Sequence, residues 1–263
     1  PGLALRKPGE SWRDAHPGDS LALSLTRDAA QRADFVLAVL DERHFAQVAG
    51  ARFPRPTATT LALLRALTSA RTRVAALIIG ANPVDLAEAD ASFAAVLQCW
   101  GTGTGFEEAL GDILSGRHAP QGRMPVAVGR YAFGQGGGFG DSAFAGLRVA
   151  ATPTGVTASL RVRNTGSFPL RETAQLYLSS PQSDGARLVD FVDLTLAPGE
   201  ETIVDFELTE RHLATGQPGS GEIHPGRHTV SIGKDRGRVL SGDMEITPAL
   251  ARAMTARGAA HLR

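Results

Sequence analysis

The sequence has almost no cysteine, no net charge and no long apolar run, and each absence excludes a class of protein. Cys99 is the only cysteine among 263 residues, so no disulfide can form within the chain and the redox compartment stays open. Lysine plus arginine equals aspartate plus glutamate at 27 each, which leaves no net field to attract nucleic acid. No apolar run is long enough for a membrane span, and no signal-peptide profile opens the chain.

Several catalytic motifs are missing as well. No Gly-x-Ser-x-Gly elbow and no Cys-x-x-Cys pair occurs, so serine-hydrolase and zinc hypotheses have no support. Cys99 lies in an apolar stretch, where a buried and inert thiol is expected. His224 and His228 are separated by Pro225-Gly226, which breaks the helix that would align both on a metal. We expect these two histidines at the surface of a turn and a strand.

The chain opens on Pro1 rather than Met. This start fits a fragment, a processed product, a subunit or an engineered piece, and a signal sequence upstream is not excluded. The length fits one or two domains, each with enough apolar residues for a core. Residues 1–20 are rich in Pro, Gly and charge, and they are predicted to form a loop or linker.

Helix and strand patterns alternate over residues 21–128 and predict an α/β layer. Three apolar runs have the composition of strands buried on both faces, as in a parallel sheet. They cover residues 34–40, 73–79 and 95–100. Helices are predicted over 26–33 and 57–70. Three strands make half a sheet, so we expect an exposed apolar face and a bare strand edge, which a partner or an upstream segment should cover.

A glycine-rich turn, residues 101–105, follows the third strand. It precedes a helix that begins at Phe106, and Gly116 is predicted to end that helix in a left-handed conformation. A phosphate-binding turn would have a small residue at Phe106 or a Gly-Lys-Ser/Thr sequence, and this chain has neither. Glu107 and Glu108 would repel a phosphate. The turn therefore gives no support to nucleotide binding.

Apolar and polar residues alternate with period two over residues 147–247, which predicts an all-β sandwich. The inward positions are Val156, Ala158, Leu160, Val162, Ala174, Leu176, Leu178, Val204, Phe206, Leu208, Val230 and Ile232. A glycine-rich linker, 129–146, joins the two halves, and its glycines are expected to permit turns. In the basic tail, 248–263, Leu250 and Met254 share one face of a frayed or surface-docked helix.

Val96–Pro125 resembles the second domain of family 3 glycoside hydrolases, the β-glucosidase and β-xylosidase group. The matching residues are Trp100, Gly101, Gly105, Ala109, Asp112, Leu114, Gly116, Pro120, Gly122, Arg123 and Pro125, with Met124 in place of the usual Leu. Later segments resemble the fibronectin type III-like domain that closes many of these enzymes. They include Asn164-Thr-Gly, Gln175-Leu-Tyr, Leu196–Glu200 and Pro225–Gly233. The resemblance implies an incomplete parallel α/β sandwich followed by an immunoglobulin/fibronectin III-like sandwich.

The same resemblance implies retaining hydrolysis of a β-linked glycoside or oligosaccharide, without a cofactor. In that family the nucleophilic aspartate belongs to a (β/α)8 barrel that this sequence lacks. The chain alone is therefore expected to be inactive, and its partner is that barrel, as a domain or a subunit. A periplasmic or extracellular location fits the family, but the sequence leaves the compartment open.

In that family the acid/base glutamate usually comes from the loop that corresponds to Asp41–Arg52. Glu42 is the only glutamate of this loop, which makes it the candidate catalytic residue. Asp41 and Arg52 are candidate substrate-binding residues. The loop follows the carboxyl end of a buried strand, where open α/β sheets place ligands.

Other interpretations of the loop stay open. No acid occurs at Gln47–Ala49, about where the family has a second carboxylate. Glu42 could instead pair with Arg43 or Arg52 at a solvated strand end, in a non-catalytic scaffold or carbohydrate-binding remnant. His44 could serve as an acid near neutral pH, although nothing else supports it. A protein-interaction module that uses the sandwich edge is a third alternative.

Overall fold

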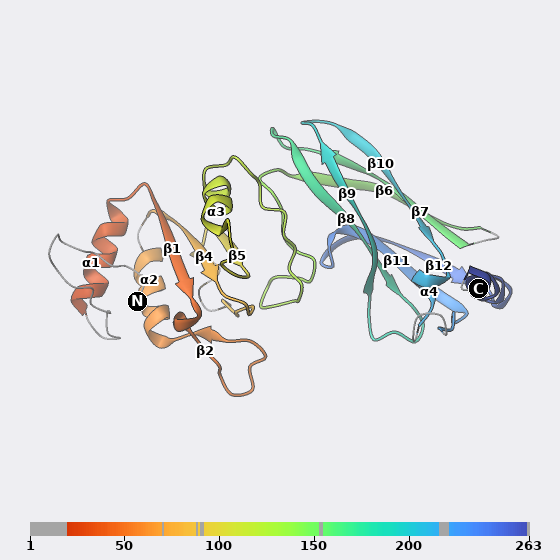
Figure 1. The fold of residues 1–263 in the computed structure, drawn as a ribbon, viewed down its shortest axis with the longest axis horizontal. Helices are drawn as coiled ribbons and strands as arrows, with labels where there is room; N and C mark the ends of the chain where they lie inside the picture. The colour runs from red at the N-terminus through yellow and green to blue at the C-terminus, as the bar shows by residue number, and fades with distance from the viewer. Residues whose placement is uncertain are drawn as a thin grey trace. The chain divides into compact units, whose positions relative to one another are not determined.

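The computed structural model describes residues 20–69, 71–87, 89, 92–152, 155–215 and 221–261. Contacts divide the chain into two compact units, Pro1–Leu110 with Val128–Arg130, and Gly111–Ala127 with Tyr131–Arg263. Figure 1 labels most of the helices and strands of the two units. The loop predicted over 1–20 lies outside the described residues except for Ser20, which begins a helix. The domain limits that the sequence suggests stay a prediction.

Three parallel strands form the sheet of the first unit. They are β1 (Phe35–Asp41), β4 (Arg73–Ile79) and β5 (Ala95–Cys99), in the order β1-β4-β5. Phe35 is in register with Arg73, and Ala75 is in register with Ala95. Val74–Ile78 of the central strand are all buried, because this strand has a neighbour on each side. The three predicted strands are confirmed.

Three helices accompany this sheet along the chain. They are α1 (Ser20–Gln31), α2 (Ala58–Thr68) and α3 (Phe106–Leu114). The first begins six residues before the predicted start at Thr26. The Thr57 hydroxyl accepts from the Thr60 N–H at 3.2 Å and caps α2. After α3, Gly116 has φ +77°, the left-handed conformation that its sequence position predicted.

The sheet leaves apolar surface uncovered. β1 stands at one end of the strand order, and the side chains of Phe35 and Val39 on this strand are 53% and 43% exposed. None of the side chains of α3 is buried. The exposed apolar surface that we expect of an incomplete sheet is therefore present in the described part of the unit.

The second unit is a sandwich of two antiparallel sheets. One has the order β10-β7-β6 and the other β12-β11-β8-β9. Their bounds are β6 (Ser142–Thr152), β7 (Gly155–Asn164), β8 (Leu170–Ser179), β9 (Arg187–Leu196), β10 (Glu201–Leu208), β11 (Gly226–Asp235) and β12 (Arg238–Ile246). All the predicted inward residues are buried, and they form one core from both sheets. The period-two prediction is confirmed.

The second unit also contains two helices, one between β10 and β11 and one after β12. They are α4 (Glu210–Leu213) and α5 (Pro248–His261). Ala251 and Met254 of α5 are buried in the sandwich core, and Leu250 packs against it. The basic tail is therefore a docked helix in its described part.

The expectation that His228 lies at the surface is wrong. Its side chain is fully buried, and its Nδ1 lies 3.1 Å from the Gly226 carbonyl oxygen. The reason is the register of β11, which places His228 on the same face as Val230 and Ile232. Burial lowers the pKa of His228. His224, in the preceding turn, is half-buried.

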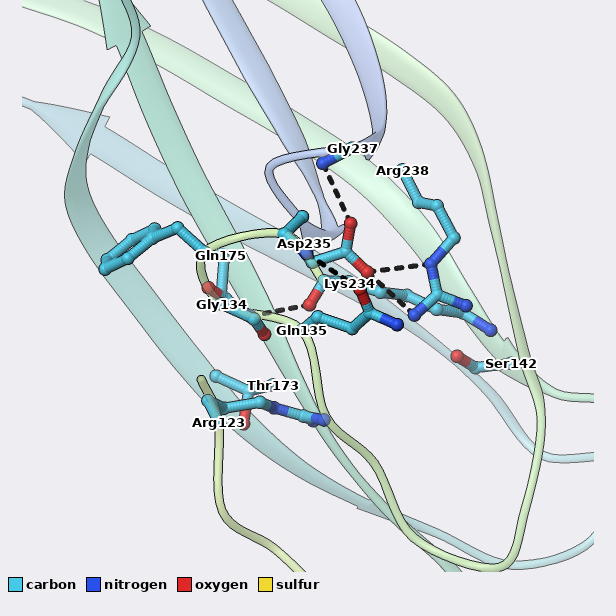
Figure 2. A network of polar contacts seen from close by, with 12 residues as sticks. Arg123, Gly134, Gln135, Ser142, Thr173, Gln175, Lys234, Asp235, Gly237 and Arg238 are labelled. Carbon is cyan, nitrogen blue, oxygen red and sulfur yellow. Dashed lines mark hydrogen bonds and ion pairs between the residues drawn. The ribbon is translucent and has the colours of Figure 1, made fainter. Parts of the chain in front are cut away.

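The connector Tyr131–Asp141 is fastened to the sandwich by polar contacts, which Figure 2 shows. The Gln175 amide on β8 donates to the carbonyl oxygens of Gly134 at 2.9 Å and Lys234 at 2.6 Å. Gly134 has φ +79°, and a Cβ there would lie 2.2 Å from Gln175 Oε1. This position therefore requires glycine both for its backbone angle and for its space.

Candidate functional site

The candidate loop begins at the carboxyl edge of the parallel sheet. Asp41 ends β1, Gly80 follows β4 and Trp100 follows β5. Because parallel strands all end at the same edge, these three positions come together although they are far apart in the sequence. The 3₁₀ turn η1 (Glu42–His44) follows Asp41 at once, and the short strands β2 (Phe45–Ala46) and β3 (Arg55–Pro56) pair within the loop.

Two pockets share this edge. The small pocket has a volume of about 170 Å³ and is lined by Glu42, Phe45, Gln47, Pro54, Ile78, Ile79, Gly80, Asn82 and Val84. The wide pocket has a volume of about 450 Å³ and is lined by Asp41, Glu42, Arg43, Ile79, Gly80, Ala81, Trp100, Gly101 and Thr102. Glu42 lines both, so its side chain lies where the two pockets meet.

The Glu42 carboxylate has no ion pair and no hydrogen bond with any other residue that the structure describes. A Cβ added to Gly80 would lie 3.3 Å from Glu42 Cγ, so the glycine leaves room for this side chain. The pairing with Arg43 or Arg52 that the alternative interpretation requires is not formed. Arg43 binds Asp41, and the Arg52 guanidinium lies over the Phe53 ring, 5.2 Å from its centroid.

Asp41 is held by its neighbours in the turn. Arg43 Nη2 lies 2.7 Å from Asp41 Oδ2, and Arg43 Nε donates to the same carboxylate. The backbone N–H of Arg43 donates to Oδ1 at 3.0 Å. These contacts, with the Arg43 side chain first, lower the pKa of Asp41 to about 2. Asp41 is therefore ionised at neutral pH, at the edge of the wide pocket.

His44 is inside the turn and lines neither pocket. Its side chain is 2% exposed, and its Nδ1 lies 3.0 Å from the backbone nitrogen of Asp41. Its Nε2 is buried without a hydrogen-bond partner among the described residues. The backbone carbonyl of His44 accepts from the N–H of Thr57 at 2.9 Å, which ties the turn to the start of α2. The suggestion of His44 as an acid finds no support in this position.

Two other residues of the loop, Arg52 and Gln47, lie in different places relative to the pockets. Arg52 is exposed and lines neither of the two pockets. Gln47 lines the small pocket, and its amide donates to the Ala51 carbonyl at 2.7 Å. Gln47 belongs to the stretch Gln47–Ala49, in which the family resemblance predicts a second carboxylate, and its side chain is an amide.

The sequence interpretation missed Trp100, Asn82 and Thr102 as pocket residues. Each follows the carboxyl end of β4 or β5, where the rule that ligands lie at the carboxyl ends of parallel strands would have pointed to them. An exposed indole beside a carboxylate is a surface on which the apolar face of a sugar ring can pack.

Possible metal ligands and the thiol of Cys99 also occur among the described residues. No cluster of three or more His, Cys, Asp or Glu side chains that could hold a metal is found there. Cys99 is half-buried, and burial raises the pKa of its thiol. No helix among the described residues is both long and apolar enough to cross a membrane.

A GH3 beta-glucosidase from Bifidobacterium adolescentis has the same fold, with TM-score 0.71 at 21% identity over 89% of this chain and 42% of that one. Residues 13–157 match the model of the glycosyl hydrolase family 3 C-terminal domain, and residues 172–236 match that of the fibronectin type III-like domain. The chain belongs to glycoside hydrolase family 3. This confirms the resemblance found in the sequence.

Individual relatives support the same assignment. A periplasmic beta-glucosidase from Salmonella typhimurium is 26% identical over 83% of this chain and 35% of its own length. An exo-alpha-(1->6)-L-arabinopyranosidase from Bifidobacterium longum is 24% identical over 90% of this chain and 37% of its own length. Beta-glucosidase 3B from Thermotoga neapolitana, solved with glucose, has the same fold, with TM-score 0.73 at 19% identity over 92% of this chain and 41% of that one. The chain thus spans about a third of the length of these curated relatives.

Proposed function

We propose that this chain is the part of a β-glucosidase-like enzyme that builds one wall of its sugar pocket. The observation that carries the proposal is the Glu42 carboxylate, which is exposed, without a described partner and located where two pockets meet. Trp100 in the wide pocket offers an apolar surface for a sugar ring. Relatives named as β-glucosidases favour a β-linked glycoside as the substrate.

The proposed mechanism is retaining double displacement. A carboxylate from a (β/α)8 barrel, on the same polypeptide or on a partner subunit, attacks the anomeric carbon and forms a glycosyl-enzyme. Glu42 first gives its proton to the leaving oxygen and then takes a proton from the water that hydrolyses the intermediate. The chain alone would have no nucleophile and therefore no activity.

Asp41 and Arg52 are proposed to bind substrate hydroxyl groups. Asp41 is ionised at the edge of the wide pocket, so its carboxylate can accept a hydrogen bond from a hydroxyl. Arg52 has an exposed guanidinium at the end of the same loop and would donate from outside the two pockets. The sandwich is proposed to support the α/β layer and its barrel.

The alternative is a non-catalytic scaffold or carbohydrate-binding remnant. The stretch Gln47–Ala49 holds no acid where the resemblance predicts a second carboxylate, and this favours the alternative. In that case the pockets would bind a sugar without cleaving it.

Hydrolysis of an aryl β-glucoside separates the two proposals. We expect no activity from the chain alone and activity once the barrel is joined to it. Glu42→Gln should then lower kcat about 10²–10⁴-fold, because it removes the acid/base group. The control is Glu210→Gln in the sandwich, which should leave kcat unchanged. Full activity of Glu42→Gln, or no activity in any combination, would favour the scaffold.

A further inference from the structure

Two turns in this chain share the sequence pattern Glu-Arg-His. The site turn is Asp41-Glu42-Arg43-His44, directly after β1, and the sandwich turn is Thr209-Glu210-Arg211-His212, directly after β10. In both, the fourth residue turns its ring back onto the first. Nδ1 of the histidine lies 3.0 Å from the backbone nitrogen of the first residue in each turn.

This contact is a capping box in which an imidazole replaces the usual Glu or Gln. The same Nδ1 also approaches the side chain of the first residue, Asp41 Oδ1 at 3.0 Å and Thr209 Oγ1 at 3.2 Å. Both histidines are buried. An Nδ1 that accepts the backbone N–H of Asp41 has no proton to give to the ionised Asp41 carboxylate, so the hydrogen bond of the site turn is the one with the backbone. A buried hydrogen bond of this kind is costly to break.

The two turns differ at their first residue. Asp41 carries a carboxylate that holds Arg43, with Nη2 and Oδ2 2.7 Å apart. Thr209 is uncharged and forms no ion pair with Arg211. Instead, Arg211 Nε lies 3.3 Å from Nε2 of His212. Only the site turn keeps its arginine on the first residue, and the carboxylate of its glutamate, which has no described partner, lies next to Gly80.

We propose that His44 and Asp41 are positioning residues, which hold the site turn so that the Glu42 carboxylate stays between the two pockets and apart from Arg43. The proposal rests on the acid/base role proposed for Glu42. A guanidinium on Glu42 would favour its ionised form, whereas the first chemical step needs a proton on this group. Displacement of a catalytic group by about 1 Å can lower a rate about 10²-fold.

Substitutions at His44 test the proposal. His44→Phe keeps a buried ring of similar size but removes the nitrogen that contacts Asp41. His44→Gln restores an acceptor of the kind that capping boxes use. His212→Phe is the matched control, because it removes the same contact from the sandwich turn.

The first measurement is amide hydrogen exchange on this chain. We expect His44→Phe to speed exchange at the Asp41 N–H about tenfold and His44→Gln to leave it near the parent rate, because one hydrogen bond is lost in the first variant only. Unchanged exchange in His44→Phe would overturn the proposal.

The second measurement is kcat/KM with the barrel joined, on aryl β-glucosides with good and poor leaving groups. This quantity reports the steps up to the glycosyl-enzyme and not its hydrolysis, in which Glu42 would act as the base. A good leaving group departs without protonation, so in kcat/KM only the poor one depends on the acid. We expect His44→Phe to lower kcat/KM about 10–100-fold for the poor leaving group, with little change for the good one. His44→Gln should recover the rate, and His212→Phe should not change it.

The outcomes separate this inference from the proposed function. If Glu42→Gln leaves kcat unchanged, the proposed function fails and the positioning role fails with it. If Glu42→Gln abolishes turnover but His44→Phe does not lower it, only the positioning role is wrong. Equal losses for both leaving groups, or an equal loss in His212→Phe, would show that the histidine merely stabilises the fold.

Discussion

Nη2 of Arg123 lies 2.7 Å from Oε1 of Glu172. This ion pair is largely buried, since the Arg123 side chain is 17% exposed and the Glu172 side chain is 7% exposed. Glu172 also accepts from the Ser142 hydroxyl at 2.6 Å. Two further nitrogens of Arg123, Nε and Nη1, are buried without partners among the described residues. The pair joins the segment before the connector to β8, and each charge depends on the other for compensation.

Removing one partner of this pair should destabilise the sandwich. We expect Arg123→Met to lower the free energy of unfolding by about 3–5 kcal/mol, because Glu172 is left buried without its countercharge. Urea denaturation measures the change. Arg161→Met is the control, since its pair with Glu201 is exposed at 3.6 Å and should change the stability by less than about 1 kcal/mol. Equal effects of the two substitutions would contradict the burial of the Arg123 charge.

Gly134→Ala should cost more stability than the same change at Gly199. Both glycines have positive φ, +79° and +77°, so an alanine is strained at either position. At Gly134 the new Cβ would also lie 2.2 Å from Gln175 Oε1 and 2.4 Å from the Tyr177 hydroxyl, whereas nothing lies within 4 Å at Gly199. We expect an excess loss of about 1–3 kcal/mol at Gly134 by urea denaturation. Equal losses would mean that the connector moves aside without cost.

The stability of the chain should fall as the pH drops below about 6.5. Burial lowers the pKa of His228, and burial followed by Arg211 lowers the pKa of His212. The unfolded chain therefore binds protons at a higher pH than the folded chain, so stabilisation is complete above the unfolded pKa and is lost on acidification. The urea midpoint should decrease from about pH 8 to about pH 5.5. His228→Leu should reduce this slope, and a parent midpoint that does not change with pH would contradict the prediction.

Trp100 should contribute to sugar affinity if the wide pocket holds a sugar ring. We expect Trp100→Ala to raise KM for an aryl β-glucoside about 3–10-fold in the assembled enzyme, with a smaller rise for Trp100→Phe, which keeps an aromatic face. Phe168→Ala is the control, because Phe168 is an exposed aromatic residue of the sandwich. If the two alanine variants have the same KM, the sugar does not contact Trp100.

The sequence predicted the parts of the fold that depend on periodicity. Alternation placed Leu160 and Val230 in the sandwich core, and both are buried there. The same rule would have placed His228 inside, because this residue precedes Val230 by two positions in one strand. Periodicity outweighs residue type at this position, because the strand fixes the direction of each side chain.

The candidate site was only partly predictable. The family resemblance selected Asp41 and Glu42, in agreement with the rule that ligands lie at the carboxyl ends of parallel strands, and both residues line the wide pocket. The place of His44 depends on a contact between its ring and the backbone of Asp41. A single sequence gives no measure of such a contact, because Glu or Gln is the usual residue at that capping position.

The exposed first strand also affects how this polypeptide behaves in solution. Among the strands that the structure describes, β1 is paired with β4 alone, and the exposed side chains of Phe35 and Val39 add apolar surface to this strand. A flank of this kind acts as a template for a second copy. We therefore infer that the isolated polypeptide self-associates as its concentration rises, and that supplying the covering neighbour keeps it dispersed.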